Sequence, residues 1–448
     1  MQRVTSAIRG AALRLGAAAA PRRSAGARGG LALLCSASPA RCSAAEAPGA
    51  AAGPAGSEAL PAALEAAWND HNLVIFSGNA NPELATEIAV LLGTALGRIT
   101  VSRFADGEVN CQVLDNVRGK DVYLIQPTCP PVNEHLMELL LMVSTMRRAS
   151  AERITCVIPY YGYARQDRKM TARVPISAAD VARLLEAMGV DRVVAVDLHC
   201  GQIQGFFGPR VPVDNLDAAQ VGYKYFANKG LVNPVVVSPD AGGVYRCARP
   251  PPAPAPRQSS PCAAHSPPPP HPPARNACCA PCRAKQFREG LNHQAPHLDA
   301  GLAMIIKQRV KAGAIERMDL VGTVDGSDVV IVDDMIDTAG TLCTAATELK
   351  RNGARRVFCF ATHGLLSGPA PDRIARSQLE EVVVTNTIPL KASARSNEKI
   401  VSLSVAPILA DTIKRVHLRQ SVSALFAVKG LAKPAAAAPA AAPAAAKQ

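Results

Sequence analysis

Thirteen residues in the second half of the chain read Val329-Val-Ile-Val-Asp-Asp-Met-Ile-Asp-Thr-Ala-Gly-Thr341. The four apolar residues predict a buried strand that delivers Asp333 and Asp334 at its carboxyl end. The small residues of Asp337–Thr341 predict a turn that opens a helix, whose free N–H groups and dipole suit a phosphate monoester. Adjacent carboxylates can accept hydrogen bonds from a vicinal diol, so the segment predicts a site for a sugar and its phosphate. The alternative interpretation is a helix-capping aspartate beside a solvated acid.

Short apolar runs bounded by turn residues recur on both sides of this segment and predict buried strands. They are Leu73–Phe76, Asp121–Ile125, Ile154–Ile158, Val193–Val196, Val235–Val237, Val329–Val332, Val357–Ala361 and Val382–Val384. Helix-period segments lie between them, including Glu83–Leu96, Asn133–Arg148 and Thr341–Leu349. Alternating strands and helices predict an α/β fold with parallel sheets, whose ligands gather at the carboxyl ends of the strands. We predict two domains, 71–216 and 217–428.

The positive charge of this chain of 448 residues is concentrated in its low-complexity segments rather than spread evenly. The formal net charge is +13, but the first 45 residues hold seven arginines and no acid, and other basic segments leave about −1 for the rest. A basic nucleic-acid surface is therefore not indicated, and no run of 18 apolar residues predicts a membrane span. Residues 1–66 have the composition of a disordered transit peptide for the chloroplast or, alternatively, the mitochondrion. Residues 429–448 predict a disordered Ala/Pro-rich tail.

A Pro-rich block at 250–283 interrupts the α/β pattern and is predicted to be inserted into a helix. It is either a surface loop or a retained intron in the gene model. Its cysteines and histidines sketch a zinc site only with irregular ligand spacing. The remaining cysteines are scattered among apolar neighbours, which is typical of reduced core residues rather than of a disulfide framework.

Further polar clusters follow other strands. Phe104-Ala-Asp-Gly-Glu108 combines a ring and two acids, and Pro159–Lys169 sets Arg165 and other cations beside tyrosines. Asp197-Leu-His199 and Ser238-Pro-Asp240-Ala-Gly-Gly243 occupy two more strand ends. The chain contains neither a G-x-x-x-x-G-K-[ST] loop nor a G-x-G-x-x-G motif, so these clusters would have to hold a nucleotide by other means.

Together these motifs resemble the ribose-phosphate pyrophosphokinase (PRPP synthetase) family over nearly all of 71–428, and the variants are similar to its phosphate-activated class. The resemblance implies two tandem Rossmann-like, type I phosphoribosyltransferase-like domains. It also implies an enzyme that transfers the diphosphoryl group of ATP to the 1-hydroxyl of ribose 5-phosphate, with Mg²⁺ as cofactor and AMP as the leaving product. The family forms hexamers in which ATP binds where two subunits meet.

The resemblance also assigns roles to individual residues. Lys307 and Arg309 match a mobile loop that closes on the diphosphoryl group, where a lost cation costs other phosphoryl-transfer enzymes about 10³–10⁵ in rate. It assigns ATP to Phe104, Asp106, Gly107, Glu108, Arg165 and Gln166. It assigns ribose 5-phosphate to Arg309, Asp333, Asp334, Asp337, Thr338, Ala339, Gly340 and Thr341. It assigns Mg²⁺ to His199 and Asp240, with Asp197 and Asp214 in the same acidic shell.

Two departures from the family pattern leave alternatives open. Gly208 follows Phe207 where the family has an aspartate, and the intervening segment is two residues longer, so one carboxylate near the metal is expected to be missing. The Pro-rich block is the second departure. A non-catalytic regulatory subunit and a PRPP-consuming phosphoribosyltransferase are the two alternative functions. The presence of Lys307, His199 and the acidic loop argues against the first of these.

Overall fold

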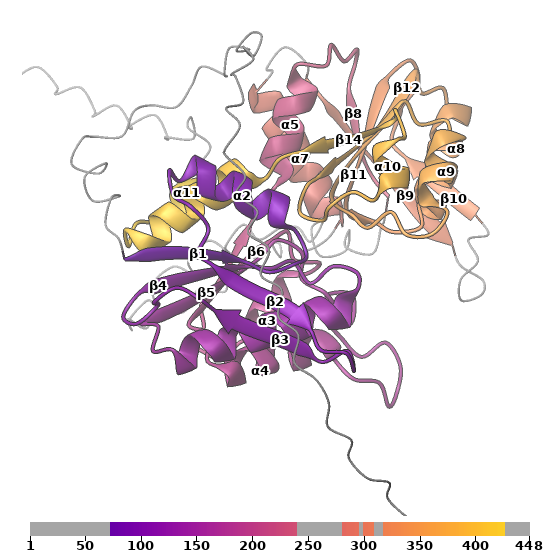
Figure 1. Ribbon diagram of the computed structural model, residues 1–448. Helices are drawn as coiled ribbons and strands as arrows, with labels where there is room; N and C mark the ends of the chain where they lie inside the picture. Colours follow the sequence, from indigo (N-terminus) through magenta and orange to yellow (C-terminus); the bar gives the residue numbers. More distant parts are fainter. Residues whose placement is uncertain (1–71, 240–279, 295–298, 309–316, 426–448) are drawn as a thin grey trace, which may run out of the picture. The chain divides into compact units, whose positions relative to one another are not determined.

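This computed structural model describes residues 72–239, 280–294, 299–308 and 317–425, all within one compact unit, Ala62–Gln448. The predicted transit peptide, the predicted tail and most of the Pro-rich block lie outside the described residues. The chain forms two parallel sheets covered by helices, which confirms the predicted α/β class (Figure 1). Within the described ranges, no helix is long and apolar enough to cross a bilayer.

The first sheet has five parallel strands in the order β1-β4-β5-β6-β7. Their bounds are β1 Leu73–Ser77, β4 Asp121–Ile125, β5 Arg153–Ile158, β6 Arg192–Val196 and β7 Val213–Leu216. The helices α3 (Val132–Arg148) and α4 (Ser177–Met188) pack on one face through a mostly aliphatic core. The other face is covered by α2 (Pro82–Leu91) and by α11 (Ala406–His417), a helix from the far end of the chain.

The second sheet has seven strands in the order β10-β9-β8-β11-β12-β13-β14, and only β10 runs antiparallel to its neighbour. The bounds are β8 Val235–Ser238, β9 Gly301–Gln308, β10 Arg317–Val321, β11 Asp328–Ile336, β12 Arg356–Gly364, β13 Glu381–Thr385 and β14 Ile400–Leu403. One face packs on α5 (Ala219–Ala227) and α7 (Ala280–Gln294), the other on α8 (Gly340–Arg351) and α9 (Ala370–Ala375).

Shorter elements complete the described chain. The strands β2 (Ile99–Arg103) and β3 (Val109–Val113) form a separate antiparallel hairpin. The remaining elements are η1 (Gly201–Phe206), α10 (Ala392–Arg395) and η3 (Ser423–Leu425).

Every strand predicted from an apolar run is present, but the apolar runs do not include β2, β3, β7, β9, β10 or β14. β7 shows the reason, since it reads Val213-Asp-Asn-Leu216 and half of it is polar. The segment packs as a strand because the neighbouring β6 supplies its hydrogen-bond partners. Edge strands of this kind carry too few apolar residues for a periodicity argument.

A buried ion cluster fixes the start of β11. The side chain of Asp328 is 0% exposed and accepts hydrogen bonds from Arg355 Nε at 2.8 Å, Arg356 Nη2 at 2.7 Å and Val232 N at 2.8 Å. Burial raises the pKa of Asp328, but the hydrogen bonds from Arg356 and Arg355 outweigh it and lower the pKa to about 2. The ionised form is therefore favoured in the folded chain.

Replacing Asp328 by asparagine is expected to lower the free energy of unfolding by about 2 kcal/mol at pH 7. Because the folded pKa is depressed, this stabilisation is present above the unfolded pKa of about 4 and is lost as the pH falls through about 2. Urea unfolding of the parent and the variant at pH 7 and pH 3 measures this contribution. The difference between their free energies of unfolding should be about half as large at pH 3 as at pH 7. An equal difference at both pH values would contradict this assignment.

Candidate functional site

The two adjacent acids lie in the second half of β11. The strand runs to Ile336, so the prediction that it ends at Val332 is wrong by four residues. The extension is explained by β12, which pairs with β11 along this length and aligns Asp333 with Ala361. The backbone N–H of Asp334 donates to Asp333 Oδ1 at 2.9 Å, which sets the orientation of the first carboxylate.

The predicted phosphate loop, Asp337–Thr341, leads directly into α8. Ala339 adopts a left-handed conformation with φ 58°, and no side chain caps the helix start that follows it. The N–H groups of the first helical turn are therefore available to an anion. Two hydrogen bonds to its carbonyls hold the loop backbone in place. Ser367 N donates to Asp337 O at 2.9 Å, and Arg373 Nη1 donates to Thr338 O at 2.9 Å.

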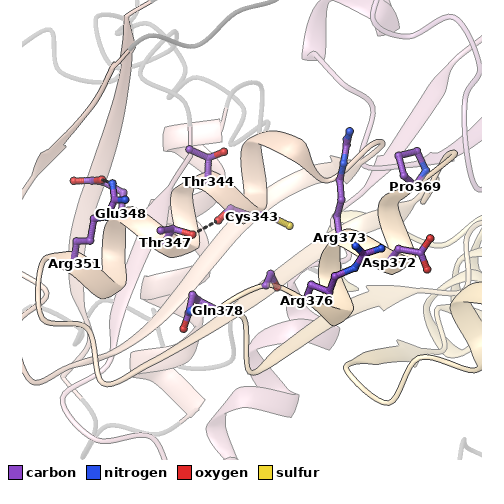
Figure 2. A pocket seen from close by; sticks show the side chains of 11 residues that line it. Cys343, Thr344, Thr347, Glu348, Arg351, Pro369, Asp372, Arg373, Arg376 and Gln378 are labelled. Carbon is purple, nitrogen blue, oxygen red and sulfur yellow. Dashed lines mark hydrogen bonds and ion pairs between the residues drawn. The ribbon is translucent and has the colours of Figure 1, made fainter.

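A groove of about 610 Å³ lies beside this loop, between α8 and α9 (Figure 2). Its lining consists of Cys343, Thr344, Thr347, Glu348, Arg351, Pro369, Asp372, Arg373, Arg376, Ser377 and Gln378. None of these residues is a predicted site residue. Arg373 connects the groove to the loop through the Thr338 carbonyl, so we assign it a supporting contact behind the phosphate site.

Replacing Ala339 by valine is expected to weaken ribose 5-phosphate binding about tenfold. A left-handed conformation costs a residue with a Cβ about 1–2 kcal/mol and disfavours a β-branched side chain further. The matched variant Ala339→Gly adopts the same φ without that cost and should bind within about threefold of the parent. Isothermal titration calorimetry with ribose 5-phosphate checks both, and equal affinities for the valine and glycine variants would contradict this account of the loop.

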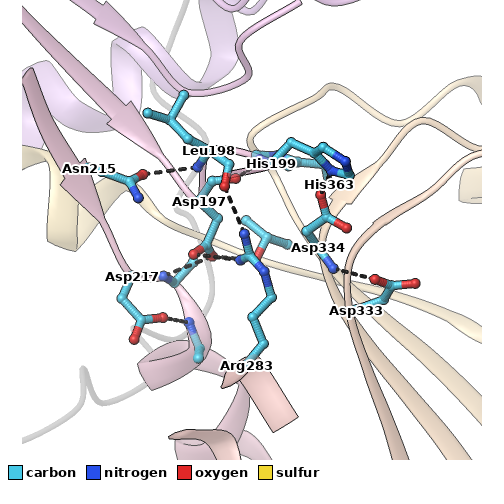
Figure 3. Close-up of polar contacts among 12 residues, drawn as sticks. Asp197, Leu198, His199, Asn215, Asp217, Arg283, Asp333, Asp334 and His363 are labelled. Carbon is cyan, nitrogen blue, oxygen red and sulfur yellow. Dashed lines mark hydrogen bonds and ion pairs between the residues drawn. The ribbon is translucent and has the colours of Figure 1, made fainter. Parts of the chain in front are cut away.

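His199 and Asp334 meet although 135 residues separate them in the chain. His199 Nδ1 lies 2.6 Å from Asp334 Oδ2, and the two side chains are 36% and 10% exposed (Figure 3). The hydrogen bond to Asp334 raises the pKa of His199. Burial raises the pKa of Asp334, but His199 and Arg283 outweigh it, so that pKa lies below its usual range. Without a metal, the pair therefore favours an imidazolium beside a carboxylate. A metal held by the ring nitrogen other than Nδ1 would require the neutral ring, with Nδ1–H still donated to Asp334.

Asp197, at the end of β6, is engaged by protein groups on both carboxylate oxygens. Oδ2 accepts from Thr362 Oγ1 at 2.5 Å and from Ala218 N at 3.1 Å, and Oδ1 lies 2.9 Å from Arg283 Nη1. The residue is 2% exposed and has φ 43°, a left-handed conformation that non-glycine residues adopt at a cost. These contacts fix the direction in which the chain leaves β6 toward His199.

Arg283 is a site residue that the sequence does not reveal. It lies in the first turn of α7, is 5% exposed, and donates from Nη2 to Leu198 O at 2.8 Å. Burial lowers its pKa, but Asp197, Asp334 and other nearby carboxylates outweigh burial and raise it. Among those carboxylates, burial and the charge of Asp197 raise the pKa of Asp217 to about 6. A lone arginine at the end of a Pro-rich block carries no sequence signal for such a contact.

The structure does not place the other two residues assigned to Mg²⁺, Asp214 and Asp240, beside His199. Asp214 lies in β7 beside Val194 and pairs with Arg192, so the structure does not bring it to His199. Asp240 lies outside the described residues. Within the described part of the chain, no three His, Cys, Asp or Glu side chains form a ready metal cage. Mg²⁺ accepts one or two protein ligands together with water and substrate phosphates, so the residues around His199 remain compatible with it.

Gly208, the position of the first departure, faces α4. Its N–H donates to Glu186 Oε2 at 3.3 Å, and a Cβ added there would lie 2.3 Å from Glu186 Oε1. A carboxylate at this position would therefore meet another carboxylate.

The predicted ATP residues fall into two groups. Arg165 reaches the phosphate loop, where Nη1 lies 2.8 Å from Asp337 Oδ2. Its neighbour Gln166 accepts from Ser177 Oγ at 2.5 Å and thereby steadies the start of α4. This segment thus joins the predicted nucleotide side to the predicted sugar-phosphate side.

The second group forms the turn of the β2–β3 hairpin. Phe104 N donates to Glu108 O at 2.8 Å, and Gly107 takes the positive φ of 94° that closes the turn. Phe104 is 55% exposed, and Asp106 and Glu108 are exposed as well. The hairpin is anchored by Arg103, whose Nη2 lies 3.2 Å from Glu138 Oε1 on α3. The turn therefore presents a ring and two acids to the exterior of the chain.

Of the two residues predicted to supply catalytic positive charge, only Lys307 lies in the described part of the chain. Lys307 lies in β9, with its Cα in register with Met318 of β10, and nothing is described of its side chain. Arg309 lies outside the described residues.

Comparisons with known proteins cover both halves of the chain. Residues 73–189 match the N-terminal domain of ribose phosphate pyrophosphokinase, and residues 293–427 match the phosphoribosyl synthetase-associated domain. A ribose-phosphate pyrophosphokinase of Helicobacter hepaticus is 44% identical over 79% of this chain and 98% of its own length. One from Vibrio parahaemolyticus is 46% identical over 79% and 99%.

A solved structure agrees with these relatives. The crystal structure of phosphoribosylpyrophosphate synthetase from Mycobacterium smegmatis matches with a TM-score of 0.63 and 37% identity, covering 78% of this chain and 99% of that one. Sequence and fold agree along nearly the whole length of these proteins. The chain therefore belongs to the ribose-phosphate pyrophosphokinase family.

Proposed function

We propose that this chain transfers the β,γ-diphosphoryl group of ATP to the 1-hydroxyl of ribose 5-phosphate. A bond forms between the sugar O1 and the β-phosphorus, the bond from that phosphorus to the α,β-bridging oxygen breaks, and AMP leaves. The hydroxyl proton is released. The observation that carries the proposal is the His199–Asp334 contact, which joins the end of β6 to the acidic strand that opens the phosphate loop. It supports a single site for a nucleotide and a sugar phosphate.

The sugar phosphate occupies the β11–α8 side of this site. Asp333 and Asp334 accept from the ribose hydroxyls, while Asp337 and the turn Thr338–Thr341 bind the 5-phosphate through backbone N–H groups and hydroxyls. The uncapped start of α8 supports this assignment. Catalysis then consists of alignment and charge stabilisation, because phosphoryl-type transfer leaves little covalent chemistry for the protein.

The nucleotide approaches from the Arg165 side. The guanidinium of Arg165 suits polyphosphate oxygens, and it already lies at the phosphate loop through Asp337. We place the adenine on Phe104, with Asp106 and Glu108 at its polar edge. The exposure of this turn supports binding where two copies of the chain meet, and hence a homo-oligomer, which we propose to be a hexamer.

Mg²⁺ is the proposed cofactor, held by His199 and Asp240. When bound, it would neutralise charge on the polyphosphate. Asp197 orients the chain before His199 rather than facing a ligand, since both of its oxygens are already engaged. Lys307 and Arg309 are proposed to approach the transferred group and stabilise its charge.

Measurement of AMP tests the proposed activity. Purified protein from about residue 67 onward is mixed with ATP, Mg²⁺ and ribose 5-phosphate. AMP release that requires ribose 5-phosphate supports the proposal. ADP release contradicts it, and no release favours a non-catalytic regulatory subunit. PRPP consumption with a nucleobase and no AMP formation from ATP would favour a phosphoribosyltransferase.

We further propose that the enzyme belongs to the phosphate-activated class. The motif sequences between Tyr160 and Ser423 resemble those of this class, which supports the proposal. Ser421 and Ser423 are candidates for part of the regulatory phosphate site. Initial rates over a range of inorganic phosphate decide the point. A rate that does not rise with phosphate would assign the chain to the phosphate-independent class.

We also propose that residues 1–66 direct the chain to the chloroplast, or alternatively to the mitochondrion. The support is their composition of arginine, serine and alanine without an acid in the first 45 residues. A fusion of residues 1–66 to a fluorescent protein tests it in plant cells. Diffuse fluorescence with no cleavage of the fusion would contradict targeting.

A further inference from the structure

Arg283 connects two parts of the fold that meet at the proposed site. Its helix, α7, packs on the second sheet, whereas its guanidinium reaches the segment that follows β6 of the first sheet. There it contacts two consecutive residues, the carboxylate of Asp197 at 2.9 Å and the carbonyl of Leu198 at 2.8 Å (Figure 3). His199 is the next residue, and its ring meets Asp334.

These contacts define the path of the backbone that carries His199. Asp197 has a left-handed φ of 43°, and Leu198 N donates to Asn215 Oδ1 at 2.9 Å. His363 adds a contact from β12, with Nε2 3.2 Å from Asp197 O. Removing the guanidinium would therefore release one carboxylate oxygen and one carbonyl at the point where the chain turns toward the site.

We propose that Arg283 is a positioning residue: it fixes Asp197 and Leu198 so that His199 meets Asp334 in the geometry that the transfer requires. The inference rests on the proposed function. Lysine cannot replace arginine here, because one ammonium group cannot reproduce two divergent N–H bonds in a fixed plane. Arg283 also supplies positive charge among Asp197, Asp217, Asp333 and Asp334, which lowers the repulsion between these carboxylates.

The position of Arg283 in the chain gives the inference a second test. The predicted insertion ends at residue 283, yet the structure places Ala280–Arg283 within α7. Excision of 250–283 joins Arg249 directly to Ala284 and restores the order Arg-Ala-Lys-Gln-Phe. We expect Arg249 then to take the helical position of Arg283. The requirement for arginine should therefore move from residue 283 to residue 249.

The first experiment compares Arg283→Lys with Lys285→Met in the chain from residue 67. Lys285 lies on the same helix, and its side chain is 59% exposed. Arg283→Lys is expected to lower kcat about 10- to 100-fold, because a displacement of about 1 Å in a site has effects of this size. Its affinity for ribose 5-phosphate, measured by calorimetry, should stay within about threefold, since the phosphate loop is untouched. Lys285→Met should match the parent in both.

A second readout does not depend on activity. The ¹³C-histidine NMR signal of His199, assigned with His199→Asn, should shift in Arg283→Lys and not in Lys285→Met. An unshifted signal together with an unchanged kcat would overturn the inference. If the parent itself releases no AMP, the proposed function fails, whereas the His199 signal still decides the role of Arg283.

The second experiment moves the arginine. Arg249→Lys should leave the full chain unchanged, but in the chain lacking 250–283 it should lower kcat as Arg283→Lys does. If Arg249→Lys lowered kcat both in the full chain and in the chain lacking 250–283, or in neither, a requirement for arginine at the position before Ala284 would be contradicted. Circular dichroism of each variant separates these effects from loss of folding.

Discussion

Lys307→Ala is expected to lower kcat about 10³-fold, with the fold and the affinity for ribose 5-phosphate retained. A cation that approaches a transferred phosphoryl group stabilises charge that is largest in the transition state, and its loss in related chemistry costs about 10³–10⁵ in rate. The backbone of Lys307 belongs to β9, which pairs with β8 and β10. The strand therefore holds the residue's position when the side chain is shortened.

Steady-state kinetics and calorimetry on the same preparations check this prediction. Lys224→Ala is the control, because Lys224 is an exposed lysine on α5 and has no proposed role. Its kcat should stay within about twofold of the parent, as expected for an exposed surface side chain. A Lys307→Ala enzyme with parental turnover would remove the catalytic role proposed for this residue.

Asp334→Asn is expected to lower kcat/KM for ribose 5-phosphate at least about 100-fold. The side chain is 10% exposed, so its interactions are screened little by water. The substitution removes a charged acceptor for the sugar and weakens the contact with His199, and each charge-assisted hydrogen bond contributes about 1.5–3 kcal/mol. Two such losses correspond to about two powers of ten or more.

A double-mutant cycle with His199→Asn distinguishes a shared site from two separate ones. Because His199 and Asp334 touch, the combined variant should lose much less than the product of the two single losses. Asp372→Asn, on α9 and exposed, is the matched control and should behave like the parent. If the loss of kcat/KM in the double variant equalled the product of the two single losses, the contact between His199 and Asp334 would make no contribution to function.

Eight strands were predictable because their short apolar runs are nearly free of polar residues and are bounded by turn residues. β11 shows the limit, since the pattern stops at Val332 while pairing with β12 carries the strand to Ile336. Asp333 and Ile336 sit in the extended part because the partner strand supplies hydrogen bonds, and one segment's composition does not contain that information. The same holds for the polar edge strand β7.

Long-range packing was the part that local patterns could not supply. The helix α11 packs with α2 on the first sheet, although more than 300 residues separate the two in the chain. Arg283 is the clearest case at the site, since the sequence assigns it to the Pro-rich block and the fold buries it beside Asp197. The contact between His199 and Asp334 likewise depends on how strands from both sheets are brought together.

In the proposed reaction, one site moves an intact diphosphoryl group from ATP to the sugar O1. ³¹P NMR of the reaction with ribose 5-phosphate tests it most directly, because it reports the phosphorus groups of every product at once. We expect a pair of mutually coupled diphosphate signals on the sugar, its unchanged 5-phosphate signal and the single phosphate of AMP. ADP together with a sugar bisphosphate would contradict it.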